Sequence, residues 1–198
     1  MLLPMYFLLG ILLVSACVTA TRNVYIDLGA NNGDSVTMFL NRFVANVSYS
    51  GDEKNIKSLK GSTSAVQNWE LYVFEAHPKY SDGLKKQRES LLNNRLVSSF
   101  YLYTDTAISV MDGSTYFILD PEGWHEGSTL MSESQSAKGE VVKVKCIDIV
   151  TLFKDIGRFS TNDTVFVKMD IEGAEFPVVK RLLQYGLLDH ITRIAIEW

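Results

Sequence analysis

The stretch TVFVKMDIEGAEFPVVKRLL, residues 164–183, joins an apolar run to a group of charged residues and then to a helical pattern. The apolar run predicts a buried strand that ends near Asp170, and the apolar spacing at 178–183 predicts the inner face of an amphipathic helix. Asp170, Glu172 and Glu175 lie close together, and like charges at short range repel each other. Each of these carboxylates therefore needs a structural partner or a function.

The same strand-then-helix pattern recurs along the chain and predicts the fold class. In an α/β fold, apolar strands alternate with amphipathic helices, and the sheet is doubly wound, mostly parallel and covered on both faces. Ligands bind such sheets at the carboxyl ends of the strands. We expect strands at 24–28, 71–74, 99–102, 141–146, 165–169 and 191–196, a hairpin formed by 107–110 and 115–119, and helices after 33 and at 78–94, 149–156 and 174–185.

The amino-acid composition limits the classes of ligand and partner that the protein is expected to bind. The length of 198 residues and the hydrophobic content of 46% suit one globular domain with a substantial core. A net charge of -4 gives no basic footprint for nucleic acid. Cys17 lies in the apolar N-terminal stretch, and Cys146 lies in a strand pattern, where we expect a core residue. The spacing of Cys and His residues matches no metal site, so we predict none.

Residues 1–20 form a continuous apolar run that ends in small residues at 18–20. This pattern predicts a signal peptide, with an uncleaved membrane anchor as the alternative. The sequons at Asn46 and Asn162 are compatible with a glycoprotein. We therefore expect a protein of the secretory pathway, lumenal, secreted or anchored as a single-pass membrane protein, with its folded domain at 21–198 and a polar insertion at about 47–68.

The segment DLGANNGDS predicts a ligand-binding turn between the first strand and its helix. Gly29 and Gly33 permit a sharp turn and a close approach of the backbone, and Asn31 tolerates unusual backbone angles. Asp27 suits a ligand that carries an ammonium group. The spacing lacks the G-x-G-x-x-G of a dinucleotide site. The alternative is an ordinary tight turn without a ligand.

Acidic residues also end the next two strands. Glu75 ends the strand at 71–74, where one carboxylate can accept hydrogen bonds from two ribose hydroxyls. Asp105 ends the strand at 99–102 and could lie beside a purine, although we favour a turn role because turns often begin with Asp. A ligand with both an ammonium group and a ribose is S-adenosylmethionine.

Four sequence blocks resemble the FkbM-like family of S-adenosylmethionine-dependent methyltransferases: DLGANNGDS, FEAHP, KMDIEGAE and the weaker AISVMDG. The resemblance covers about residues 24–198. It implies a class I, Rossmann-like methyltransferase fold and methyl transfer to oxygen, often on a hydroxyl of a sugar or another small molecule. The matching blocks imply cofactor contacts for Asp27, Gly29, Gly33 and Glu75, and an active-site role for Asp170 and Glu172.

The family normally adds a strand pair after the strand seen here at 191–196, so we expect a C-terminally truncated sheet. That strand is then expected to be an exposed edge that can associate with a second copy. Two other functions remain open. One is a catalytically inactive binding module in the secretory pathway, and the other is a nucleotide-sugar or nicotinamide enzyme, which the glycine spacing disfavours.

Asp170 is the expected catalytic group, because it ends a central strand beside the glycine turn. It could accept the hydroxyl proton or bind a divalent cation that holds the hydroxyl. The alternative is that Asp170 caps the following helix, with Glu172 and Glu175 at the helix start, and we assign Glu175 to that structural role. His125 is a weaker candidate base, because a single loop histidine is more often solvated.

Overall fold

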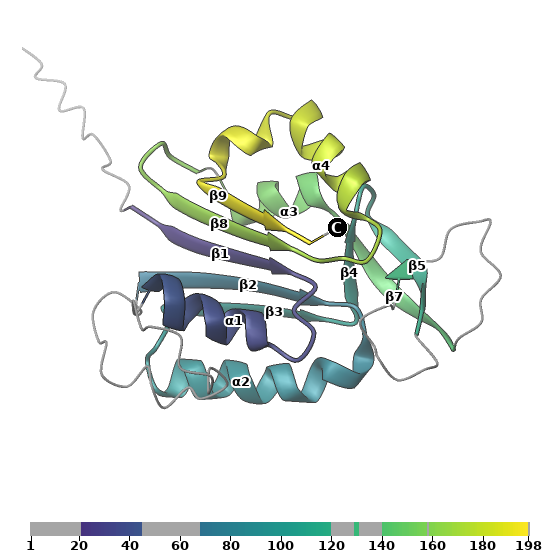
Figure 1. Cartoon of the computed structure of the whole chain (residues 1–198), viewed down its shortest axis with the longest axis horizontal. Coiled ribbons are helices and arrows are strands. Elements are labelled where there is room, and N and C mark those ends of the chain that lie inside the picture. The colour runs from purple at the N-terminus through teal and green to yellow at the C-terminus, as the bar shows by residue number, and fades with distance from the viewer. Residues whose placement is uncertain (1–20, 45–67, 120–128, 131–139, 158, 198) are drawn as a thin grey trace, which may run out of the picture.

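The structure, a computed structural model, describes residues 21–44, 68–119, 129–130, 140–157 and 159–197. Its centre is a parallel sheet of five strands in the order β3-β2-β1-β8-β9 (Figure 1). This confirms the α/β fold with a mostly parallel sheet. The strands are β1 (Asn23–Leu28), β2 (Trp69–Glu75), β3 (Ser99–Thr104), β8 (Thr164–Met169) and β9 (Arg193–Ile196).

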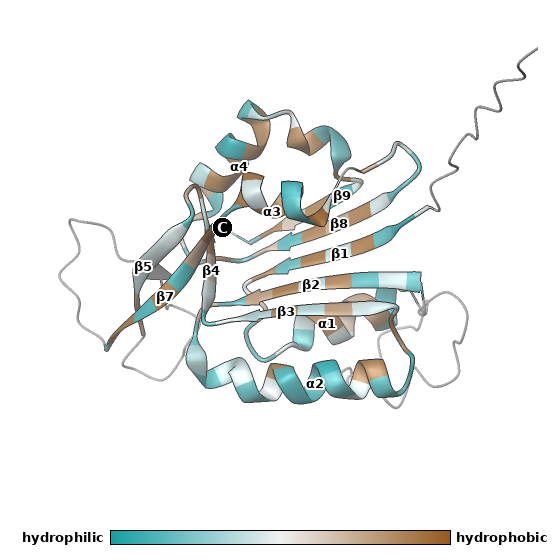
Figure 2. Cartoon of the chain, turned by 180° about the vertical axis from the view of Figure 1, so that it is seen from behind, coloured by the Kyte–Doolittle hydropathy of each residue, from teal (hydrophilic) through white to brown (hydrophobic). Residues whose placement is uncertain are grey.

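Helices cover both faces of this sheet (Figures 1 and 2). One face carries α1 (Asp34–Phe39), which continues as a π-helix (Leu40–Val44), and α2 (Ser81–Asn93), which follows a 3-10 turn (Pro78–Tyr80). The other face carries α3 (Ile149–Ile156) and α4 (Glu175–Gln184), and a second 3-10 turn (Leu187–His190) follows α4.

Alternation along β1 divides the core between the two faces. Ile26 and Leu28 pack with the α3 and α4 side, whereas Tyr25 packs with the α1 and α2 side. Successive side chains of a strand point to opposite faces, so a strand with helices on both sides is apolar throughout. This position places the end of β1, with Asp27 and the glycine turn, at the centre of the carboxyl edge.

A second sheet lies beside the carboxyl ends of the parallel strands (Figure 1). Its strands are β4 (Thr106–Ser109), β5 (Gly113–Ile118), β6 (Thr129–Leu130) and β7 (Val141–Asp148), in the order β4-β7-β5-β6. The predicted hairpin of 107–110 with 115–119 is therefore wrong, because β7 lies between its two strands. β4 pairs with β7 in parallel, and β5 pairs with β7 antiparallel.

The turn before β5 gives a physical reason for this arrangement. The carboxylate of Asp112 accepts hydrogen bonds from the Asp148 backbone N–H (2.9 Å) and from the Thr151 hydroxyl (2.7 Å). These bonds fasten the turn to the start of α3, so β4 and β5 are held apart and β7 fits between them. Cys146, on β7, is buried as expected.

Asp148 connects α3 and α4, the two helices that cover the same face of the parallel sheet. Its carboxylate accepts a hydrogen bond from the Val150 N–H, so it is the predicted N-cap of α3. It also pairs with Arg181 of α4, and this hydrogen-bonded guanidinium lowers the pKa of Asp148 below its ordinary value. On α4, Val178 is fully buried as predicted, but Leu183 is 62% exposed, which corrects its predicted inward position.

Within the described residues, β9 is an edge strand that pairs with β8 alone, and Arg193, Ile194 and Ala195 are exposed. The strand predicted at 191–196 is observed as Arg193–Ile196, and within the described residues it forms the exposed edge that the sequence predicts. Among these described parts of the chain, no helix combines the length and the apolar character needed to span a membrane. Several predicted features lie outside the described residues: the run at 1–20, nearly all of the insertion at 47–68, Asn46 and His125.

Candidate active site at the carboxyl edge of the sheet

The glycine turn after β1 is fastened to both neighbouring strands. The N–H groups of Gly29 and Ala30 donate to the carbonyl oxygen of Phe74 on β2 (3.1 and 2.9 Å). Gly29 has a φ of 84°, and a Cβ there would lie 2.9 Å from the carbonyl carbon of Asp170 and overlap its oxygen. Gly29 is therefore required for the close approach of the chain that leaves β8, in addition to any contact with a ligand.

Glu75 holds this turn from the end of β2. Its Oε2 accepts a hydrogen bond from the Asn31 N–H, and its Oε1 accepts one from the His77 N–H, both at 2.6 Å. The residue is 6% exposed, and this burial raises the pKa of Glu75, while the two backbone bonds act in the opposite direction. Each carboxylate oxygen can accept a further hydrogen bond. The ribose contacts assigned to Glu75 and Asn31 stay predictions.

Asp27 is fully buried one residue before the end of β1. Its Oδ2 accepts hydrogen bonds from the hydroxyls of Ser35 (2.5 Å) and Tyr25 (3.3 Å). Burial raises the pKa of Asp27, and the ammonium of Lys168, 3.7 Å from Oδ1, opposes that shift. The cation beside Asp27 is thus a lysine of β8. A direct contact between Asp27 and a ligand ammonium stays a prediction.

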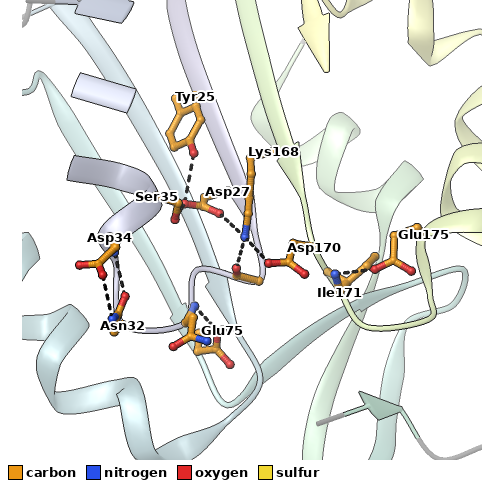
Figure 3. A network of polar contacts seen from close by, with 12 residues as sticks. Tyr25, Asp27, Asn32, Asp34, Ser35, Glu75, Lys168, Asp170, Ile171 and Glu175 are labelled. Atoms are coloured by element: carbon orange, nitrogen blue, oxygen red, sulfur yellow. Dashed lines mark hydrogen bonds and ion pairs between the residues drawn. The ribbon is translucent and has the colours of Figure 1, made fainter. Parts of the chain in front are cut away.

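Lys168 links the two acidic strand ends (Figure 3). Its ammonium donates to the Gly29 carbonyl oxygen (2.5 Å) and to Asp170 Oδ2 (3.0 Å), and it also lies near the Asp27 carboxylate. One positive charge therefore offsets part of the repulsion between two carboxylates and fixes the turn between them. This arrangement accounts for the charged residues that directly follow the apolar run of β8.

The three carboxylates after β8 have different environments. Asp170 does not cap α4, because the N-cap residue is Ala174 and no side chain caps that helix. Glu175 has the structural role: its carboxylate accepts hydrogen bonds from the Ile171 N–H (2.7 Å) and the Gly173 N–H (2.8 Å). The Asp170 side chain is 28% exposed, so it is accessible from the edge.

Glu172, Gly33 and Asp105 complete the set of predicted site residues. Glu172 lies in the loop before α4 with a φ of 51°, and its active-site role stays a prediction. A Cβ at Gly33 would overlap the amide of Gln87, which donates to the Gly33 carbonyl oxygen (2.8 Å). Asp105 is exposed in the turn between β3 and β4, and its carbonyl oxygen accepts the Lys145 N–H (2.9 Å). This geometry favours the turn role of Asp105, and its purine contact stays a prediction.

A cavity of about 730 Å³ lies between α1 and the strands β8 and β9, next to Lys168 and Asp170. Its size is that of a small-molecule site. The sequence patterns did not reveal this cavity, although the alternation along β8 carried a signal, because every second residue of that strand faces the α1 side. The aromatic and basic lining residues that were missed are Tyr25, Phe39, Phe166 and Arg193.

In the part of the chain that the structure describes, no group of three His, Cys, Asp or Glu side chains is arranged to hold a metal ion. The route in which a divalent cation binds the acceptor hydroxyl therefore has no three-ligand site among these residues. The charged residues that line this end of the cavity are Asp34, Lys168, Asp170 and Glu197, and among them Asp170 and Lys168 form an ion pair beside the glycine turn. Together they can orient a hydroxyl and accept its proton.

Comparisons with known proteins identify the family to which the chain belongs. Searches of curated proteins and of solved structures found no match to this chain. The family described as the Methyltransferase FkbM domain matches residues 27–198, which includes the glycine turn, Glu75, and the loop from Asp170 to Glu175. The match spans most of the chain and the whole carboxyl edge of the parallel sheet. The chain belongs to the FkbM methyltransferase family.

Proposed function

We propose that this protein is an S-adenosylmethionine-dependent O-methyltransferase that acts on a hydroxyl of a sugar or another small molecule. The observation that carries the proposal is the Lys168 ammonium, which joins the glycine turn to Asp170 in the lining of a cavity. S-adenosylmethionine supplies a methyl group on a positively charged sulfur. The protein has to bind this donor, orient the acceptor hydroxyl and take up its proton.

The residues at the ends of β1 and β2 fit such a donor. Glu75 is a nearly buried carboxylate with remaining acceptor capacity, as a ribose with two hydroxyls requires. The glycine turn beside it carries no side chain at Gly29 or Gly33 to block a ligand. We assign Glu75 and the 27–33 segment to donor binding, with Asp27 acting through Lys168 and Ser35.

Asp170 and Lys168 fit the acceptor side of the reaction. The partly exposed Asp170 carboxylate can accept a hydrogen bond from an acceptor hydroxyl and then its proton as the new bond forms. Lys168 supports the negative charge of that carboxylate at 3.0 Å and keeps it at the end of β8. Holding the hydroxyl in line with the donor supplies the largest part of the rate enhancement.

The test compares wild type with Asp170→Asn in methyl transfer from labelled S-adenosylmethionine to a panel of hydroxylated acceptors. Asn keeps the shape and loses the charge, so turnover should fall about a hundredfold while donor affinity remains near wild type. Asp189→Asn, an exposed change in the turn after α4, is the matched control. Full turnover by Asp170→Asn would make that carboxylate structural, and loss of activity with a chelator would support the metal route.

A second candidate is a noncatalytic binding module in the secretory pathway, and the exposed β9 edge favours it. An unpaired strand edge can bind another chain, including a second copy of this protein. Donor binding without transfer to any acceptor, together with concentration-dependent association, would support this candidate.

We also propose entry into the secretory pathway with removal of residues 1–20. Expression in animal cells, N-terminal sequencing and endoglycosidase treatment test this proposal. An intact, unglycosylated protein that faces the cytosol would contradict it.

A further inference from the structure

The shape and lining of the cavity between α1 and β8–β9 define the class of acceptor more narrowly, an inference that rests on the proposed function. β8 and β9 form its floor, and α1 forms one wall. The register pairs Phe166 with Arg193 and Lys168 with Ala195, so each level of the floor carries one residue from each strand. From Phe166 to Asp170, the residue after β8, the chain advances four residues, about 13 Å at about 3.3 Å per residue. The floor is therefore elongated.

The middle of the cavity is apolar and aromatic. The rings of Tyr25 and Phe39 stack with centroids 3.9 Å apart, and Phe166 meets Phe39 edge to face at 5.7 Å. Met38 adds a flexible apolar side chain that is 40% exposed. Such walls bury an alkyl or aromatic body well. They offer few hydrogen-bond partners for the many hydroxyls of a sugar ring.

Charged groups stand at the two ends of this apolar stretch. Lys168, Asp170 and Glu197 mark the carboxyl end, where Lys168 and Asp170 already pair with each other. Arg193 marks the other end, with its guanidinium 5.5 Å from the centre of the Phe166 ring. Among the described residues, no carboxylate forms an ion pair with Arg193. A cation without an ionic partner at the end of an apolar cavity matches an anionic group of a ligand.

We infer that the acceptor is an elongated hydroxy acid. Its hydroxyl lies at Lys168 and Asp170, its apolar chain lies along Phe39 and Phe166, and its carboxylate binds Arg193. In the transfer, the acceptor oxygen forms a bond to the donor's methyl carbon, and the carbon–sulfur bond breaks with its electron pair left on sulfur. The hydroxyl proton passes to Asp170 and then to water. The products are a methyl ether and S-adenosylhomocysteine.

The test measures binding by calorimetry, so it does not depend on turnover. The probes are an ω-hydroxy fatty acid of about ten carbons, which spans the distance between the two charged ends, and the α,ω-diol of the same length. Wild type should bind the acid about five- to tenfold more tightly than the diol. Arg193→Gln should remove that preference and leave the affinity for the diol unchanged. Lys180→Gln, an exposed change on α4, should keep the preference.

Salt provides a second readout that needs no variant. Raising the ionic strength should weaken binding of the acid and leave binding of the diol nearly constant, because the charge of Arg193 is exposed and screened. Equal affinity for acid and diol, or a preference that Arg193→Gln retains, would overturn the inference. Binding of S-adenosylmethionine is measured in the same samples: donor binding without acid preference contradicts only the acceptor assignment, whereas absent donor binding contradicts the proposed function itself.

Discussion

The two halves of the carboxyl edge differ in how firmly their side chains are held. At the ends of β1 and β2, Asp27 and Glu75 are buried, and each accepts two hydrogen bonds from named donors. At β8 and β9, Asp170 is partly exposed and Arg193 is exposed with no ionic partner among the described residues. Under the proposed function this difference corresponds to two tasks. The firm half, at the ends of β1 and β2, would be preorganised for the donor, and the open half, at β8 and β9, would admit an acceptor that enters and leaves.

Lys168 is the residue that joins the two halves. Its ammonium contacts the Gly29 carbonyl and lies beside both Asp27 and Asp170 (Figure 3). Besides the backbone pairing of β1 with β8, the two halves are connected by this side chain and by the contact of Gly29 with the backbone of Asp170. Substitutions at Gly29 and Lys168 should therefore reveal how strongly the firm half depends on those two contacts.

The largest effect is expected for Gly29→Ala. The new methyl group would overlap the backbone of Asp170, and the φ of 84° is strained for alanine, so the free energy of unfolding should fall by more than about 4 kcal/mol. Gly83→Ala, in α2, is the control, because a Cβ there meets no atom within 4 Å. It should stabilise the protein by about 0.5–1 kcal/mol. Urea unfolding measures the free energy of unfolding of both variants. Similar effects of the two changes would contradict the tight contact between Gly29 and the backbone of Asp170.

The next effect is expected for Lys168→Met. The substitution leaves the fully buried Asp27 carboxylate without its nearby cation, which should lower the free energy of unfolding by about 3 kcal/mol. Lys180→Met removes an exposed lysine from α4 and should change stability by less than about 0.5 kcal/mol. If chemical denaturation gives the same small change for both variants, Lys168 does not hold the two halves together.

A smaller effect is expected in how the stability contributions of Asp27 and Asp148 depend on pH. Burial raises the pKa of Asp27, so the folded state binds more protons, and its contribution to stability falls as pH rises above about 4. The Arg181 guanidinium lowers the pKa of Asp148, so its contribution is present above about 4 and is lost as pH falls below that value.

The free energies of unfolding of the two asparagine variants should therefore change in opposite directions with pH. Urea unfolding at pH values below and above about 4 measures this. As pH rises, Asp27→Asn should gain stability relative to wild type, whereas Asp148→Asn should lose stability relative to wild type. Parallel pH profiles would show that Asp27 is not a buried, disfavoured charge.

Local patterns in the sequence predicted the firm half well. The apolar runs that end at Asp27 and Glu75 are the adjacent parallel strands β1 and β2, and their carboxyl ends meet at one edge of the sheet, as the pattern predicts. The structural role of Glu75 within the turn was not predicted, since its bonds to Asn31 and His77 join backbone groups that no pattern of side chains reveals.

The open half and the second sheet depend on distant partners, so the sequence predicted them less well. β4 and β5 look like a hairpin because a short turn separates them, yet the contacts of Asp112 with Asp148 and Thr151 admit β7 between them. Likewise, Arg193 has no neighbouring motif, and its place opposite Phe166 follows only from the register of β8 and β9.

The most direct test of the central claim is calorimetric titration of S-adenosylmethionine into wild type, Glu75→Ala and Glu70→Ala, with NAD as a control ligand. Both glutamates belong to β2, but Glu70 pairs with Arg22 at the far end of the strand. Wild type and Glu70→Ala should bind the donor and not NAD, and folded Glu75→Ala should lose about 3 kcal/mol or more of binding free energy. Equal donor affinity in Glu75→Ala and wild type, or tighter binding of NAD, would contradict the assignment of this edge to S-adenosylmethionine.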